Sequence, residues 1–266
     1  MSRPLLQVEK IEVVYKRVIT AVQGVTLSVG PKQIVAILGI NGAGKTTTLR
    51  AISGFLGLDD AHVTEGSISF EGRRIENALP HDIAARGIVL VPERDKVFPN
   101  LTVAENLAVP VSRVNAAERR RQDEQIFSLF PRLAELRQRI GGLLSGGERQ
   151  MLAIAGALMC RPNLLLVDEL SLGLAPVVVQ DLTRRLLAVR DELGIAILLV
   201  EQSAAAALAV ADHAYVMESG RVVLDGDRER LKSHQDVQEF YLGQAGGERR
   251  SYRAVKQYRR SRRWYG

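Results

Sequence analysis

Residues 39–46 have the types and the spacing of a phosphate-binding loop, Gly-x-x-x-x-Gly-Lys-[Ser/Thr]. The glycines would let backbone N–H groups close on phosphate oxygens, and Lys45 would reach the outer phosphates. The hydroxyl of Thr46 is a ligand for Mg²⁺. The stretch therefore predicts a site for a nucleoside triphosphate with Mg²⁺. The residues expected to contact the nucleotide here are Gly39, Ile40, Asn41, Gly42, Ala43, Gly44, Lys45, Thr46 and Thr47.

A second group of reactive side chains follows the apolar run 164–167, which ends on Asp168 and Glu169. A buried strand does not normally finish on two adjacent acids unless its end faces a charged group. Asp168 could hold the Mg²⁺ of the nucleotide, and Glu169 could orient or deprotonate the attacking water. A strand that meets a solvent turn is the alternative, and the phosphate loop earlier in the chain favours the catalytic interpretation.

A third group begins at Ser145, where Ser145 and Glu148 have the spacing of a helix capping box. A capped helix does not need two glycines inside the cap, yet Gly146 and Gly147 stand there. They would expose consecutive backbone N–H groups at a helix N-terminus, which is a second site for an anion. Two phosphate-binding surfaces and one nucleotide predict that each nucleotide is shared between two subunits.

The elements that must position these groups are strands and helices of an α/β fold. Hydrophobic patterning predicts strands over 7–15, 21–29, 33–38, 66–70, 87–91, 164–167, 195–200 and 214–218. The first three suggest a small antiparallel sheet beside a parallel core. The stretch 103–143 is mostly helical in pattern, with breaks at Pro110 and Pro131. It predicts a helical block inserted into a nucleotide-binding fold.

Composition agrees with a globular chain: 266 residues, 46% of them hydrophobic, can bury one large core or a core with a subdomain. No run of 18 apolar residues and no charged-then-apolar leader is present, so we expect a chain that neither spans a membrane nor is secreted. The single cysteine, Cys160, follows an apolar helical pattern and is expected to be buried.

The formal net charge of +6 is concentrated at the C-terminus, because residues 248–266 carry +7 and the remainder −1. We expect residues 244–266 to form a basic, disordered tail. Arginines interleaved with aromatic residues suit contact with anionic lipid or, less readily, nucleic acid, and a solvated extension without a partner is the third reading.

The order of phosphate loop, Ser-Gly-Gly segment and Asp-Glu strand resembles the ATP-binding subunits of ATP-binding cassette (ABC) transporters. The resemblance implies a P-loop NTPase core with a mixed parallel sheet, an N-terminal antiparallel β subdomain and a helical subdomain at about 95–158, within a domain of 1–243. It also implies two subunits packed head to tail. The phosphate loop of one would face residues 145–148 of the other across ATP.

The same resemblance assigns further site residues. Tyr15 stands where the family stacks an aromatic ring on adenine, although an ordinary strand-edge tyrosine is the alternative. Glu93 replaces the glutamine that touches Mg²⁺ in most cassettes, so Thr46, Glu93 and Asp168 are the expected metal ligands. Gln202 replaces the histidine that contacts the γ-phosphate and is the expected catalytic partner of Glu169.

Over residues 6–243 the chain is similar to the F-type ATP-binding subunit of branched-chain amino acid importers. The segments that carry this likeness are 91–93, 101–107, 171–176 and 199–202. The likeness implies ATP-driven uptake, a peripheral place on the cytoplasmic face of the cytoplasmic membrane, and several partners. These are a G-type ATP-binding subunit (or a second copy of the chain in isolation), two membrane permeases and an extracytoplasmic amino-acid-binding protein.

Two residues depart from that branch: Arg94 stands where glycine is usual, and Leu170 where proline is usual. Loss of the proline is expected to loosen the turn after the catalytic strand. Residues 171–176 are expected at the interface between subunits, and residues 93–106 are expected to receive a coupling helix from a permease.

Three other functions remain open at this point. A urea or short-amide importer uses closely similar cassettes. An ABC ATPase acting on DNA or ribosomes would suit the basic tail, but such proteins usually carry two cassettes or a long coiled coil. A regulatory module that holds ATP without hydrolysing it is the third.

Overall fold

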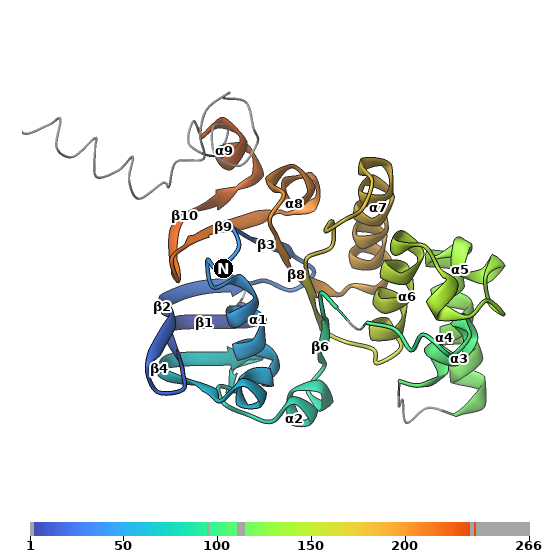
Figure 1. The fold of residues 1–266 in the computed structure, drawn as a ribbon, viewed down its shortest axis with the longest axis horizontal. Coiled ribbons are helices and arrows are strands. Elements are labelled where there is room, and N and C mark those ends of the chain that lie inside the picture. The colour runs from blue at the N-terminus through green and yellow to red at the C-terminus, as the bar shows by residue number, and fades with distance from the viewer. Residues whose placement is uncertain (1–2, 95, 111–114, 235–236, 238–266) are drawn as a thin grey trace, which may run out of the picture.

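The computed structural model describes residues 3–94, 96–110, 115–234 and 237 of the chain. The predicted basic tail, 244–266, and the predicted domain end at 243 lie outside the described residues. Two sheets organise the fold, and they lie side by side with helices between and around them (Figure 1).

The first sheet is antiparallel, with the order β2-β1-β4-β5. Its strands are β1 (Leu6–Tyr15), β2 (Ile19–Val29), β4 (Ala61–Phe70) and β5 (Arg73–Arg74). β4 extends further than the predicted 66–70 because Gly66 is a bulge within the strand and not its beginning. Gly66 has φ +82°, and a Cβ there would lie 2.3 Å from the carbonyl oxygen of Glu9, so only glycine fits.

The second sheet has the order β10-β9-β3-β8-β7-β6 and is parallel except for β10, which pairs antiparallel with β9. Its strands are β3 (Ile34–Leu38), β6 (Ile88–Val91), β7 (Leu164–Asp168), β8 (Ala196–Glu201), β9 (His213–Glu218) and β10 (Arg221–Asp227). The expectation that run 33–38 joins the antiparallel sheet was wrong. All five residues of β3 are buried, as a strand inside a parallel sheet requires.

Alternate residues of the parallel strands serve the opposite faces of this sheet. Val35 and Ile37 pack into the core shared with the antiparallel sheet, where helix α1 (Lys45–Ser53) contributes Leu49 and Ile52. Leu165 and Val167 point into the second core, under helices α6 (Gly146–Leu158) and α7 (Pro176–Leu193). A third, smaller cluster lies under α8 (Ala204–Val210) and α9 (Arg228–Ser233).

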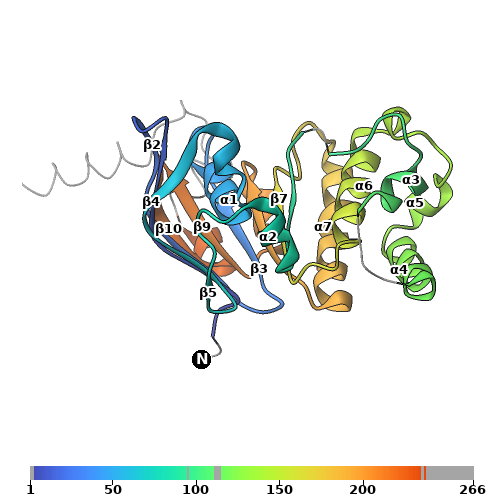
Figure 2. The same ribbon diagram turned by 90° about the horizontal axis from the view of Figure 1, so that it is seen from below.

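The predicted helical block is confirmed and projects to one side of the sheet, beyond α6 (Figures 1 and 2). It contains α3 (Val103–Ala108), α4 (Ala116–Leu129), α5 (Pro131–Glu135) and the 3-10 turn Gly141–Leu143. Pro131 begins α5 because its missing N–H costs nothing at a first helical position. A second 3-10 turn, Phe55–Asp59, and α2 (Pro80–Ala85) connect the two sheets.

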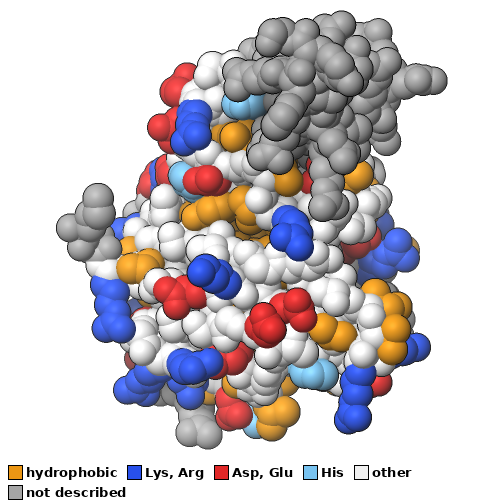
Figure 3. Space-filling view, turned by 90° about the vertical axis from the view of Figure 1, so that its left-hand side faces the viewer, with side chains coloured by type: hydrophobic (Ala, Val, Ile, Leu, Met, Phe, Trp, Pro, Cys, Tyr) orange, Lys and Arg blue, Asp and Glu red, His pale blue; other side chains and the backbone are white. Residues whose placement is uncertain are grey.

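Two surface features complete the description. Among the described residues no helix is long and apolar enough to cross a membrane. On the side that carries the antiparallel sheet, acidic and basic side chains are interspersed (Figure 3).

The prediction for Cys160 was wrong: it is exposed, because the buried face of α6 ends at Leu158 and the chain turns there. Partial burial nevertheless raises the pKa of its thiol.

Candidate functional site

The phosphate loop lies between the end of β3 and the start of α1, in the strand-loop-helix order that the motif needs. Gly39 passes so close to β9 that a Cβ would lie 2.5 Å from the carbonyl oxygen of Met217. Gly44 caps α1 with φ +97°, a conformation that only glycine adopts readily. The amino group of Lys45 donates to the carbonyl oxygens of Gly39 (2.8 Å) and Ile40 (3.3 Å), so it lies back over the loop.

The two acids at the end of β7 meet this loop. The hydroxyl of Thr46 donates to Asp168 Oδ1 at 3.2 Å, and Lys45 Nζ lies 3.3 Å from Glu169 Oε1. β8 lies between β3 and β7, which brings both strand ends to one edge of the sheet. A ligand site at the carboxyl ends of parallel strands is the usual place in this class of fold.

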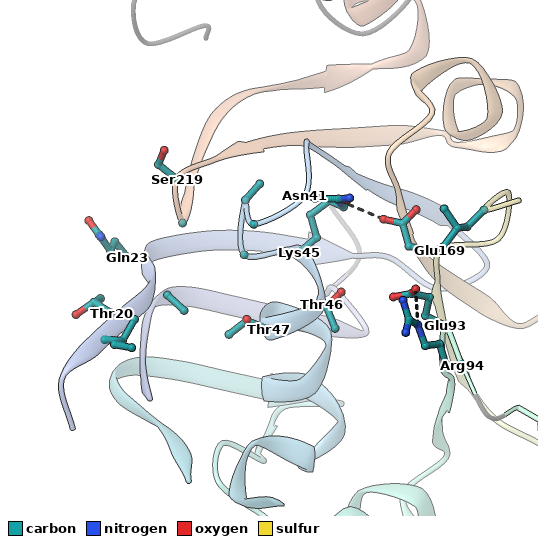
Figure 4. Close-up of a pocket in the computed structure, with 17 residues that line it drawn as sticks. Thr20, Gln23, Asn41, Lys45, Thr46, Thr47, Glu93, Arg94, Glu169 and Ser219 are labelled. Carbon is teal, nitrogen blue, oxygen red and sulfur yellow. Dashed lines mark hydrogen bonds and ion pairs between the residues drawn. The ribbon is translucent and has the colours of Figure 1, made fainter. Parts of the chain in front are cut away.

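A cavity of about 700 Å³ opens above these residues, within the size range of ligand pockets (Figure 4). Its walls come from β2, from the phosphate loop and α1, from the turn after β6, from the segment after β7 and from the turn between β9 and β10. The lining residues are Ile19, Thr20, Ala21, Gln23, Asn41, Gly42, Ala43, Gly44, Lys45, Thr46, Thr47, Glu93, Arg94, Glu169, Leu172, Ser219 and Gly220.

Burial destabilises the charged carboxylates of this site, so a nearby positive charge would stabilise them. Desolvation raises the pKa of Asp168 to about 6, and the neighbouring Glu169 and Glu93 act in the same direction. The hydrogen bond from Thr46 and the charge of Lys45 oppose that rise. A divalent cation would relieve the same repulsion without a proton.

The residues present fit Mg²⁺, with the protein supplying only some of the ligands of the ion. Thr46 and Asp168 already touch, and both line an adjoining cavity together with Glu93, although Arg94 pairs with Glu93 at 3.2 Å. Across the described part of the chain, no group of three His, Cys, Asp or Glu side chains could hold a metal alone. Mg²⁺ commonly binds through one or two carboxylates and the phosphates of the nucleotide, so this donor set suits it.

Tyr15 does not line the cavity. Its hydroxyl lies 3.3 Å from Thr47 Oγ1, and its ring packs against the core between the sheets. The cavity wall at that end is built by Ile19, Thr20 and Gln23 of β2 instead. Tyr15 therefore contacts the cavity wall through Thr47, and its stacking on adenine stays a prediction.

Residues 145–148 also lie outside the cavity, at the N-terminus of α6. Their capping box is complete: Glu148 N donates to Ser145 Oγ at 3.3 Å, and Ser145 N donates to Glu148 Oε2 at 2.8 Å. The glycines have a packing reason besides exposure of N–H groups. A Cβ on Gly147 would lie 2.4 Å from Val178 Cγ1, so α6 meets α7 too closely for a side chain.

The segment after β7 is held more firmly than the absence of proline predicted. Leu170 is 1% exposed and packs in the second core. Glu169 has φ +51°, and its Oε2 accepts a hydrogen bond from the backbone N–H of Gln202 at 3.3 Å. Gln202 thus contacts Glu169 through its backbone, and its side chain does not line the cavity.

Two residues near the site had no predicted role. Glu201 ends the apolar run 195–200 on a buried acid, the same signal that singled out Asp168, and Ser171 donates to it twice. Lys96 Nζ donates to Gln150 Oε1 of α6, which joins the turn after β6 to the helical block. Burial lowers the pKa of Lys96. A lysine in a polar loop gives no comparable signal in the sequence.

Comparison with known proteins agrees with this geometry. A family model described as ABC transporter matches residues 22–171. The high-affinity branched-chain amino acid transport ATP-binding protein BraG of Pseudomonas aeruginosa is 39% identical over 239 residues, covering 90% of this chain and 100% of that protein. The probable branched-chain amino acid transport ATP-binding protein LivF of Archaeoglobus fulgidus is 39% identical over 210 residues, covering 79% and 87%.

Among solved structures, the ADP conformation of MJ1267, an ATP-binding cassette of an ABC transporter, superposes with a TM-score of 0.74 at 30% identity. The superposition covers 91% of this chain and 100% of that one. The strand-loop-helix site, the paired acids and these matches together show that the chain belongs to the ABC transporter family, as one of its ATP-hydrolysing ATP-binding subunits.

Proposed function

We propose that this chain is the ATPase subunit that powers import of branched-chain amino acids across the cytoplasmic membrane. The observation that carries the proposal is the 39% identity to BraG over 90% of the chain, because the match also covers the full length of that protein. The contacts of the phosphate loop support the ATPase half of the proposal, since Thr46 bonds to Asp168 and Lys45 pairs with Glu169.

In the proposed reaction the loop 39–47 binds the phosphates of ATP through backbone N–H groups. Thr46, Asp168 and Glu93 would hold Mg²⁺, which when bound would neutralise charge on the phosphate oxygens. Glu169 accepts a proton from the attacking water. Lys45 pairs with Glu169 in this structure, so a phosphate that draws Lys45 away also frees the carboxylate to act as the base.

The reaction site is completed by a second subunit. Residues 145–148 present a helix N-terminus but lie outside the cavity of their own chain, so the nucleotide they serve belongs to a partner. Leu172 lines the cavity and is 55% exposed, which suits an interface residue. The partner is a related ATP-binding subunit, or a second copy of this chain in isolation.

The membrane permeases dock beside the helical block. A cavity of about 230 Å³ lies between β6, the turn that follows it, α3 and α6, with Val97, Phe98 and Leu152 among its lining. Phe98 is 53% exposed there. The Lys96 to Gln150 hydrogen bond ties this wall to the turn that carries Glu93, so a permease helix in the cavity can respond to the nucleotide.

Reconstitution with its partner ATP-binding subunit, its two permeases and its binding protein tests the proposal. Proteoliposomes loaded with ATP should accumulate leucine, isoleucine or valine, and Glu169→Gln should reduce both uptake and ATP turnover about 100-fold or more while ATP still binds. Uptake of urea or short amides in place of leucine would overturn the proposed solute. Recovery of the chain with DNA or ribosomes and without permeases would overturn transport itself.

A further inference from the structure

Glu201, the last residue of β8, is a buried carboxylate outside the phosphate cavity. It is 0% exposed and does not line the cavity. Removing a carboxylate from water is costly unless donors satisfy its oxygens, so the donors indicate what the carboxylate holds. Burial, together with the charge of the nearby Glu169, raises the pKa of Glu201 to about 7 even though hydrogen bonds from Ser171 and Ser203 oppose the rise, so the position is unfavourable for a charged carboxylate.

Both oxygens of Glu201 are occupied by one residue. Ser171 N donates to Oε1 at 2.8 Å, and Ser171 Oγ donates to Oε2 at 2.6 Å. The backbone N–H of Ser203 adds a third hydrogen bond. Because backbone and side chain of Ser171 bind the same carboxylate, the pair restrains the chain at Ser171 in both position and orientation.

The restrained residue lies next to the catalytic base in the chain and in space. Ser171 is two residues after Glu169, and Gln202 directly follows Glu201. Glu169 N donates to Val200 O at 3.0 Å, and Gln202 N donates to Glu169 Oε2 at 3.3 Å. Glu169 also has φ +51°, a left-handed conformation that is strained for a residue with a side chain and persists only where the neighbouring chain enforces it.

We propose that Glu201 is a positioning residue for ATP hydrolysis: by gripping Ser171 it fixes Glu169 in its reacting geometry and ties the 171–176 segment to β8. Glu201 does not line the cavity, and its carboxylate binds Ser171, so it acts through Ser171. The inference rests on the ATPase activity of the family and is independent of the transported solute.

Three variants of the full-length chain test whether the contact between Glu201 and Ser171 positions Glu169. Glu201→Ala should lower kcat about 100-fold and leave the KM for ATP within about threefold, because misplacing a catalytic group by about 1 Å costs this much while the phosphate loop is untouched. Glu201→Gln keeps an acceptor for Ser171 N and a polar partner for its hydroxyl, so it should retain kcat within about threefold. Ser171→Ala should lower kcat about tenfold.

The double variant Glu201→Ala/Ser171→Ala should be no slower than Glu201→Ala alone, since both changes break one contact. Amide hydrogen exchange over 171–176 should rise in Glu201→Ala, a readout that does not depend on turnover. Asn77→Ala is the matched control: Asn77 also makes two hydrogen bonds to one residue, Val63, but in the antiparallel sheet. It should lower thermal stability and leave kcat within about twofold.

Additive losses in the double variant, or unchanged exchange over 171–176 in Glu201→Ala, would overturn the proposal. A loss of kcat in Glu201→Gln as large as in Glu201→Ala would overturn it too. The charge of Glu201, and not its hydrogen bonds with Ser171, would then determine the rate. If Asn77→Ala and Glu201→Ala changed KM and kcat to the same extent, Glu201 would only stabilise the fold, and the proposal would be overturned.

Discussion

At the scale of single residues, the site is arranged around the amino group of Lys45. It holds two loop carbonyls and the carboxylate of Glu169 in the structure described above, and all three contacts occupy donors that a triphosphate would take. Lys45 is 5% exposed, so its charge acts with little screening. The same side chain therefore stabilises the empty loop and binds the nucleotide.

Lys45→Ala should weaken ATP binding about 10-fold to 100-fold, because charge-assisted hydrogen bonds contribute about 1.5–3 kcal/mol. Isothermal titration of the purified chain with ATP and Mg²⁺ measures this. Lys32→Ala is the matched control, since Lys32 is an exposed lysine in the turn that precedes β3, at the far end of the same strand. Equal losses in both variants would show that net charge, and not the loop, attracts the nucleotide.

Titration of Glu201 gives a separate prediction for stability. Its pKa is raised by burial to about 7, from the ordinary 4.5. The folded chain therefore binds more protons than the unfolded chain between these values, and the free energy of unfolding falls as pH rises from about 4.5 to about 7. Asp168, raised to about 6, adds a slope of the same sign.

Glu201→Gln should flatten that dependence, with the variant gaining at most about 3 kcal/mol on the wild type above pH 7 and nothing below pH 4.5. Denaturant unfolding at several pH values without nucleotide or metal measures it. A wild-type stability that rises with pH over this window would contradict the prediction.

At the scale of elements, the contact between α6 and α7 explains why glycine stands at position 147. A Cβ there would overlap Val178, whereas a Cβ on Gly156, later in the same helix, would meet nothing within 4 Å. Gly147 and Gly156 therefore lie in the same helix but in different surroundings. This pair separates the packing requirement from the intrinsic preference of a helix.

Gly147→Ala should destabilise the chain by about 1–3 kcal/mol, because it forces α6 away from α7. Gly156→Ala should stabilise it by about 0.5–1 kcal/mol through helix propensity. Thermal or denaturant unfolding of both variants compares them directly. Similar effects of the two substitutions would show that α6 can move aside, and that the glycine serves only to expose N–H groups.

The elements also show how far the sequence predicts this fold. Eight strands and the helical block were predicted close to their observed places, because alternating burial and long amphipathic runs are local signals. The two-residue strand β5, the strand β10 and the assignment of β3 to its sheet were missed. A strand's neighbours depend on which faces are covered by helices, and no pattern within 33–38 contains that information.

At the scale of the whole molecule, the phosphate cavity and residues 145–148 lie apart on one chain, so a complete site needs two chains. A dimer of two copies of this chain, or of this chain and a related subunit, would then carry two such sites. The arrangement makes a specific prediction for mixtures of variants, in which each chain lacks a different half of the site.

Lys45→Ala and Ser145→Arg should each abolish ATP turnover alone, whereas an equimolar mixture should recover about one quarter of the wild-type rate, because about half of the dimers are mixed and each contains one intact site. Steady-state ATPase measurements of the separate and mixed proteins test this. No recovery in a mixture that sedimentation shows to be dimeric would contradict sharing of the site.

By itself the sequence determined the chemistry of this protein: a phosphate loop, two acids at a strand end and a glycine-rich helix start. Each is a contiguous motif whose geometry follows from the backbone of a few residues. Only the tertiary structure decided which motifs meet. Thr46 reaches Asp168 and Lys45 reaches Glu169 because β8 places their strands on either side of it, and the same strand ends on Glu201 beneath them. Such contacts depend on strand order and on the packing of helices against both faces, which local spacing does not encode.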